Sequence, residues 1–172
     1  SSHVRPSGNR LAIVTNGGGP GVMATDRAVE LGVRMAALSP ATVEALDAAL
    51  PENWSRANPL DIIGDAGAAR YRAAVAACLA DDGVDGVLVM LTPQAMTRPT
   101  EAAEAVIDVA RDAKKPVLAC WMGEAQVHEG RRLFKQAGIP YFTTPEPAVE
   151  VFSFLSAFYE NQRQLMQTPE PL

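Results

Sequence analysis

The stretch LAIVTNGGGPGVMATD, residues 11–26, decides the fold and carries the first functional signal. Residues 11–14 predict a buried parallel strand, because both faces of this short run are apolar. The turn at residues 16–21 has almost no side chains, so its backbone N–H groups can approach a ligand closely. Pro20 suits the first turn of a helix, where its missing N–H is not needed. A glycine turn that ends at a helix N-terminus attracts anions, so the stretch predicts a phosphate site.

Strand and helix patterns alternate through the rest of the chain. The predicted strands are residues 11–15, 34–38, 86–91, 116–120 and 140–142. The predicted helices are residues 21–31, 41–50, 68–80, 100–113, 127–136 and 147–164. Repeated strand–helix units imply an α/β, flavodoxin-like doubly wound parallel sheet of about five strands, with helices on both faces.

Length and composition indicate a single domain of ordinary soluble type, since the chain has 172 residues, 48% of them hydrophobic. We expect residues 1–7 to be a tag remnant or linker, residues 8–160 the domain, and residues 161–172 the start of another linker. The net charge of −5 argues against nucleic acid, and no segment predicts a membrane span or signal peptide. Cys78 and Cys120 lie in apolar patterns, which favours buried free thiols in a reducing cytoplasm over a disulfide.

Four loops follow predicted strands or precede helices, at the edge where such sheets bind ligands. The site residues that we predict in them are Asn16, Gly17, Gly18, Gly19 and Gly21; Asn58, Asp61 and Gly64; Thr92, Pro93, Gln94 and Ala95; and Trp121 and Gly123. Each loop also has a purely structural interpretation. The glycines could form only a tight turn, Asp61 an Asx turn or helix cap, residues 92–97 a capped turn, and Trp121 a lid over the core.

Named nucleotide motifs and catalytic groups are scarce. No Gly-Lys-Ser/Thr follows the glycines, and residues 19–24 match the dinucleotide fingerprint only formally, without an acidic residue after the second strand. A flavin rests on fold class alone. His128 has no nucleophile paired with it by spacing, and two His and two Cys are too few for a zinc site. Asp81, Asp82 and Asp85 are predicted to be surface charges. We therefore predict an anion cradle with no catalytic residue and no metal.

The set of loops resembles the ligase-CoA domain of the nucleoside-diphosphate-forming acyl-CoA synthetases, the superfamily of succinyl-CoA synthetase and ADP-forming acetyl-CoA synthetase. The resemblance rests on GNRLAIVTNGGGPGVMATD, NPLDIIGDA, GVLVMLTPQAMT, KPVLACWMGEAQVHEGRRLF and AGIPYFTTPEPAV, in this order. NQRQLMQTPEPL resembles the linker that leads into an ATP-grasp domain in single-chain members.

The resemblance implies a role in phosphoryl relay. In that family a phosphorylated histidine on a neighbouring domain is held by opposed helix N-termini, and one of them would be the helix that opens here at Gly21. Asn16 and residues 17–19 would form the cradle, and residues 92–95 would touch the acyl or acyl-phosphate group. Pro-Gln-Ala replaces the glycines of succinate-handling members, which argues against succinate. This domain would bind no cofactor itself, whereas ATP or ADP, CoA and Mg²⁺ belong to the parent enzyme.

The implied partners are a CoA-binding and phosphohistidine domain, an ATP-grasp domain and, in some members, an N-acetyltransferase domain. The isolated fragment is then expected to be inactive. The alternative is a regulatory ligand-sensing module of a synthetase-like protein acetyltransferase that has lost the ligase chemistry. A third interpretation is a stand-alone flavin or nucleotide binder.

Overall fold

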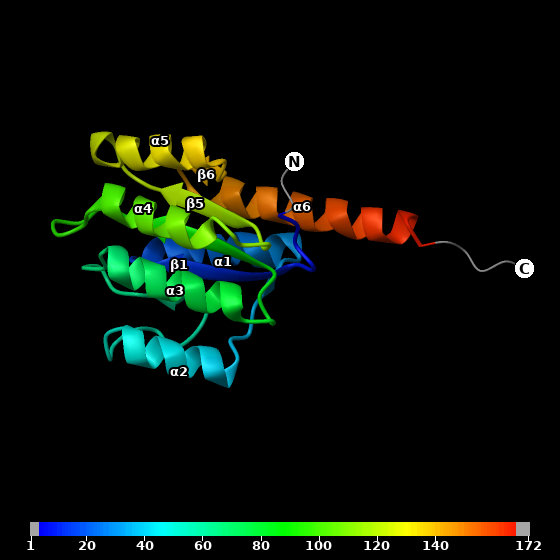
Figure 1. The fold of residues 1–172 in the computed structure, drawn as a ribbon, viewed down its shortest axis with the longest axis horizontal. Coiled ribbons are helices and arrows are strands. Elements are labelled where there is room, and N and C mark those ends of the chain that lie inside the picture. Colours follow the sequence, from blue (N-terminus) through cyan, green and yellow to red (C-terminus); the bar gives the residue numbers. More distant parts are fainter. Residues whose placement is uncertain (1–3, 168–172) are drawn as a thin grey trace, which may run out of the picture.

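The computed structural model describes residues 4–167, and they form one parallel sheet between two layers of helices (Figure 1). The strands are β1 (Arg10–Thr15), β2 (Arg34–Met35), β3 (Leu60–Asp61), β4 (Gly86–Leu91), β5 (Val117–Trp121) and β6 (Tyr141–Phe142). The helices are α1 (Gly18–Leu31), α2 (Pro40–Ala49), α3 (Ala68–Ala80), α4 (Pro99–Ala110), α5 (His128–Ala137), α6 (Pro145–Leu165) and the short 3-10 helix η1 (Ala125–Val127). The predicted α/β, doubly wound fold is confirmed.

The strand order is β2-β1-β4-β5-β6, and β3 also pairs with β1. The short β3 was missed in the sequence, where its residues were assigned to a loop. β2 pairs with the start of β1 and β3 with its end, so together they occupy one edge. With β3 set aside, the order is that of flavodoxin-like sheets, which bind ligands where the strand order reverses. This point lies between β1 and β4, at their carboxyl ends.

Two apolar layers hold the sheet. On one face, α1 and α6 pack through Ala24, Ala28, Val149 and Phe152. The opposite face is covered by α2, α3, α4 and α5, with Trp121 in that core. β1, β4 and β5 are therefore apolar on both sides, as the sequence predicts, and they fix the carboxyl ends that carry the loops.

Helix ends agree with the sequence patterns in part. Gly32 and Gly138 end α1 and α5 with φ of 73° each, a left-handed conformation that favours glycine. α1 begins at Gly18 rather than Gly21, so most of the predicted glycine loop is the first turn of the helix. Thr144 precedes α6, but its side chain makes no capping hydrogen bond.

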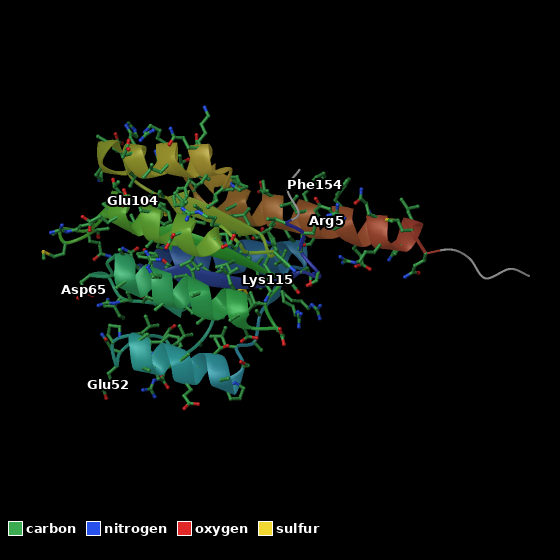
Figure 2. The ribbon with its side chains drawn as sticks, in the orientation of Figure 1. Arg5, Glu52, Asp65, Glu104, Lys115 and Phe154 are labelled. Atoms are coloured by element: carbon green, nitrogen blue, oxygen red, sulfur yellow. The ribbon has the colours of Figure 1, made fainter. Side chains whose placement is uncertain are left out.

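α6 is only partly a core helix, although the sequence favours packing of residues 149–158 on the core. Phe152 is fully buried, whereas Phe154 is 69% exposed and Phe158 is 44% exposed. Figure 2 labels Phe154 on α6. The helix continues to Leu165, into the predicted linker, and residues 168–172 lie outside the described part. No helix among the described residues is both long and apolar enough to span a membrane.

The amino-terminal edge of the sheet contains two buried acids, which corrects the prediction that they are surface charges. Asp85 is 0% exposed and Asp81 is 5% exposed. Asp85 accepts hydrogen bonds from Arg10 and Ser7, and Asp81 accepts them from the backbone of Ser39 and Gly83. These partners replace the lost water, which sequence spacing could not show. Residues 4–7 thus pack on the domain, while residues 1–3 of the predicted tag remnant lie outside the described part.

Candidate functional site

Residues 92–94 follow the central strand β4, and the loops after β1, β3 and β5 converge on this segment. Its neighbours are Asn16 after β1, Gly64 after β3 and Gly123 after β5. In Figure 2, Asp65 lies toward this edge of the sheet, and Lys115 lies toward the opposite edge, where β5 begins. Four separate predictions from sequence thus describe one place in the fold.

Asn16 joins the first and third of these loops. Its side chain is buried, its Oδ1 accepts from the Thr92 N–H at 2.8 Å, and its Nδ2 donates to the Thr92 carbonyl at 2.9 Å. A carboxamide is the side chain that can satisfy a backbone donor and acceptor at once. Asn16 is therefore a structural clamp that positions the cradle.

The glycine turn presents free amides. Gly17 caps α1 without a side-chain hydrogen bond, and its own N–H donates to the Thr15 hydroxyl at 3.0 Å. Pro20 has no N–H, so Gly18 and Gly19 supply the two first-turn amides that lack an intrahelical acceptor. A Cβ atom on Gly19 would meet nothing within 4 Å, so this turn faces open space.

The charges around the turn are unusual for a helix start. The first turn of α1 contains no acidic residue, so its own side chains do not neutralise the helix dipole. Asp61 comes close from β3, with Oδ2 3.7 Å from the Cβ position of Gly18. The Thr92 hydroxyl oxygen lies 3.3 Å from the Cβ position of Gly17, and it is buried with no hydrogen-bond partner.

Gly64 and Gly123 leave space for the segment after β4. The Gln94 carboxamide occupies the place where a Cβ of Gly64 would lie, and its Nε2 donates to the Asn16 carbonyl at 3.4 Å. The Cγ of Pro93 lies 2.6 Å from the Cβ position of Gly123, whose φ is 126°. Ala95 is exposed beside them. Gln94 and Pro93 thus come so close to Gly64 and Gly123 that a side chain would not fit there, which explains the two glycines without a ligand.

Comparison with known proteins identifies the family of this chain. The profile of the ligase-CoA domain family matches residues 11–168. The chain belongs to the ligase-CoA domain family. It is 40% identical over 154 residues to acetate–CoA ligase (ADP-forming) I of Archaeoglobus fulgidus. The match covers 90% of this chain but only 22% of that protein. It is 37% identical over 146 residues to the alpha subunit of acetate–CoA ligase (ADP-forming) II of Pyrococcus furiosus, covering 82% of this chain and 32% of that subunit.

A solved structure shares the fold. Acetyl-coenzyme A synthetase 1 of Ca. Korarchaeum cryptofilum, in complex with phosphate and ADP, superposes with a TM-score of 0.88 at 29% identity. The match covers 98% of this chain and 38% of that chain. This ligase-CoA domain thus spans between a fifth and two fifths of the length of these three proteins.

Two predicted site residues of this ligase-CoA domain, Asn58 and Trp121, form hydrogen bonds with backbone groups of the fold. The Asn58 side chain bonds to the backbone of Ile13, Leu11 and Ala36, filling the gap between β2 and β3 at the edge of β1. Trp121 is the last residue of β5 rather than a loop residue, and it is fully buried. Its Nε1 donates to the Pro99 carbonyl at 2.9 Å, so the interpretation of Trp121 as part of the core is the one the structure favours.

Arg131 is a supporting residue that the sequence analysis missed. Its guanidinium donates to the carbonyls of Trp121 and Gly123, at 3.0 Å to each from Nε and Nη2 respectively. It thereby fixes the turn against which Pro93 rests. In the sequence, Arg131 is recognisable only as an arginine in the first turn of the helix that follows the Gly123 loop. Its partner carbonyls could not be identified from residue spacing.

Reactive groups are absent from the cradle itself. His128 is exposed at the start of α5, and Cys78 and Cys120 are free and buried. Burial raises the pKa of each thiol to about 12. Within residues 4–167, no group of three or more His, Cys, Asp or Glu side chains could hold a metal. The glycine turn itself has no nucleophile or general base, because residues 17–21 carry no titratable side chain.

Proposed function

We propose that this chain is the ligase-CoA domain of an ADP-forming acyl-CoA synthetase, and that the N-terminus of α1 binds the transferring phosphoryl group. The observation that carries the proposal is the pair of free amides at Gly18 and Gly19, in a turn with open space and no first-turn acid. Amides aimed at a phosphoryl group stabilise it electrostatically without reacting. A domain with such a cradle and no nucleophile needs a reactive group from elsewhere.

The partner that we propose is a phosphohistidine on another domain of the parent enzyme. It would enter the open side of the turn at Gly19, while Asn16 holds the turn against Thr92. The CoA-binding and ATP-grasp domains of the parent would supply ATP or ADP, CoA and Mg²⁺. The relatives named above are whole ligases or subunits much longer than this chain, which is consistent with this division of labour.

The segment Thr92–Pro93–Gln94–Ala95 is proposed as the acyl side of the site. It borders the cradle, and its Gln94 carboxamide and Pro93 ring narrow the space that glycines would leave open. A narrower site suits a small acyl group such as acetate better than succinate. The acetate–CoA ligases among the relatives support this choice. The ligase names also favour the synthetase over the regulatory acetyltransferase module.

The test uses the complete synthetase chain that contains this domain, incubated with ATP, CoA and acetate. Mass spectrometry would look for an acid-labile phosphohistidine and for acetyl-CoA. Gly19→Asp adds a carboxylate to the open first turn, where an acid stabilises the helix but repels phosphate. We expect acetyl-CoA formation to fall about a hundredfold or more, since electrostatic donors of this kind contribute on that scale.

Gly67→Asp is the matched control. Gly67 caps α3, and a Cβ there also meets nothing within 4 Å, so the variant adds the same charge to the start of another helix. It should retain acetyl-CoA formation. Equal activity in the two variants would contradict the assignment of the cradle to residues 17–19.

A further inference from the structure

Asp61 is the carboxylate that comes close to the first residue of α1 at the proposed phosphoryl site, and its position is set by its own backbone. Its Oδ1 accepts the N–H of Ile63 at 2.9 Å, an Asx turn that fixes the side chain after β3. Its Oδ2 faces the first residue of α1, 3.7 Å from the Cβ position of Gly18. Among residues 4–167, Oδ2 has no hydrogen-bond or ion-pair partner.

A carboxylate in this position disfavours a simple anion. It shares the positive end of α1 with any phosphate bound at the amides of Gly18 and Gly19, and the two negative charges repel. Asp61 and Gly18 also line a pocket of about 260 Å³ together with Thr15 and Thr25. Asp26 of α1 also lines this pocket and no basic side chain does, so the pocket lining adds negative charge and does not compensate the repulsion.

A second observation points to a ligand at the same turn. The Thr92 hydroxyl is buried without a partner beside Gly17, on the side of the turn toward β4. Buried hydroxyl groups in proteins are nearly always hydrogen-bonded, so an unsatisfied one beside the glycine turn indicates a missing acceptor. A phosphoryl oxygen supplies that acceptor. The turn therefore offers donors from Gly18, Gly19 and Thr92, and one acceptor from Asp61.

We infer that Asp61 is a specificity residue. It favours a phosphoryl group that is attached next to a positively charged N–H donor, and it disfavours a phosphate that has no such donor. A phosphorylated imidazole meets this description when its second ring nitrogen is protonated, because the carboxylate then pairs with the imidazolium while the amides hold the phosphoryl oxygens. The inference rests on the proposed function and adds the charge state of the group that the site accepts.

Two small phosphonates of equal shape test it: aminoethylphosphonate, which has an ammonium group, and propylphosphonate, which has a methyl group in its place. Each is titrated into this chain while the amide signals of Gly18 and Gly19 are followed by NMR. The variant is Asp61→Asn, which retains an oxygen for the Ile63 N–H. Asp65→Asn, at an exposed carboxylate paired with Arg70, is the matched control.

In Asp61→Asn we expect propylphosphonate to bind about fivefold more tightly, because the repulsion between the carboxylate and the phosphonate is removed. We expect aminoethylphosphonate to bind about fivefold more weakly, because its ammonium group loses the carboxylate that attracts it. Asp65→Asn should change neither affinity. A purely structural Asp61 would shift both affinities in the same direction or not at all, and either result overturns the inference. If Mg²⁺ makes propylphosphonate bind the unaltered chain as tightly as aminoethylphosphonate, Asp61 pairs with a cation rather than an N–H donor, and the inference fails. If neither phosphonate moves the two amide signals in the unaltered chain, the proposed function fails as well.

Discussion

The side chain of Asn16 and the backbone of Thr92 form two hydrogen bonds, at 2.8 and 2.9 Å, that connect the ends of β1 and β4. These strands are neighbours at the point where the strand order reverses. The pair sets the spacing between the glycine turn and the Thr92 segment. The site is therefore held by the sheet and not by the loops alone.

Asn16→Ala should lower the free energy of unfolding by about 2–4 kcal/mol, because the Thr92 N–H and carbonyl lose their buried partners. Urea unfolding measures this loss. Asn161→Ala, on the exposed side of α6, should stay within about 0.5 kcal/mol of the unaltered chain. Similar losses in the two variants would show that the Asn16 pair contributes nothing specific.

Gly123→Ala should destabilise the chain more than Gly64→Ala. At position 123 the new Cβ would meet the rigid Pro93 ring at 2.6 Å, in a backbone conformation with φ of 126°. At position 64 it would meet the flexible end of Gln94, which can swing aside. We expect a loss of about 2 kcal/mol or more for Gly123→Ala and less than about 1 kcal/mol for Gly64→Ala.

Thermal unfolding and the NMR signal of the Gln94 side-chain amide separate the two cases. Gly64→Ala should move that signal while the melting temperature changes little, because only the side chain is displaced. Gly123→Ala should lower the melting temperature. The reverse order of stability would mean that Gln94, and not Pro93, is the rigid neighbour.

The parts of the fold that follow from apolar runs could be predicted from sequence. Residues 11–15 and 86–91 are apolar on both faces, and such runs are found in buried parallel strands. β3 could not be predicted, since Leu60 and Asp61 pair with the end of β1 beside side-chain hydrogen bonds from Asn58 that spacing does not show. A two-residue strand has no periodicity to detect.

The candidate site was predictable as a set of loops but not as a set of contacts. Strand ends on one edge of a parallel sheet converge by topology, which is why Asn16, Gly64, Thr92 and Gly123 meet. Whether a glycine there serves a ligand or a neighbouring side chain depends on distances of a few ångströms, as Gly64 and Gly123 show. The burial of Asp85 was missed because its partner Arg10 lies far away in the chain.

The cysteines should be unreactive in the folded chain. Cys78 and Cys120 are fully buried, and burial raises the pKa of each thiol to about 12, so little thiolate forms near neutral pH. A colorimetric thiol reagent should label neither residue in the native protein and both after unfolding in urea. Rapid labelling of one thiol without urea would show that its layer of the core opens locally.

Acid should destabilise the chain through Asp85. Burial alone would raise the pKa of this carboxyl, but hydrogen bonds from the Arg10 side chain and backbone and from Ser7 outweigh it and lower the pKa below its ordinary value of 3.8. A lowered pKa in the folded state means that the ionised group stabilises the fold above the pKa of the unfolded chain. This contribution is lost as the pH falls below about 4 and through the folded-state pKa.

Asp85→Asn tests this dependence, because it removes the charge and keeps one acceptor for Arg10. Urea unfolding at neutral pH should show a loss of about 2 kcal/mol, and the fall in stability below about pH 4 should become shallower. Asp82→Asn changes an exposed neighbour whose carboxylate has no hydrogen-bond or ion-pair partner among residues 4–167, and it should leave the pH profile unchanged. An equally steep acid transition in Asp85→Asn would assign the acid sensitivity to other carboxyl groups. Asp81 is the next candidate, since hydrogen bonds outweigh the effect of burial and lower its pKa as well.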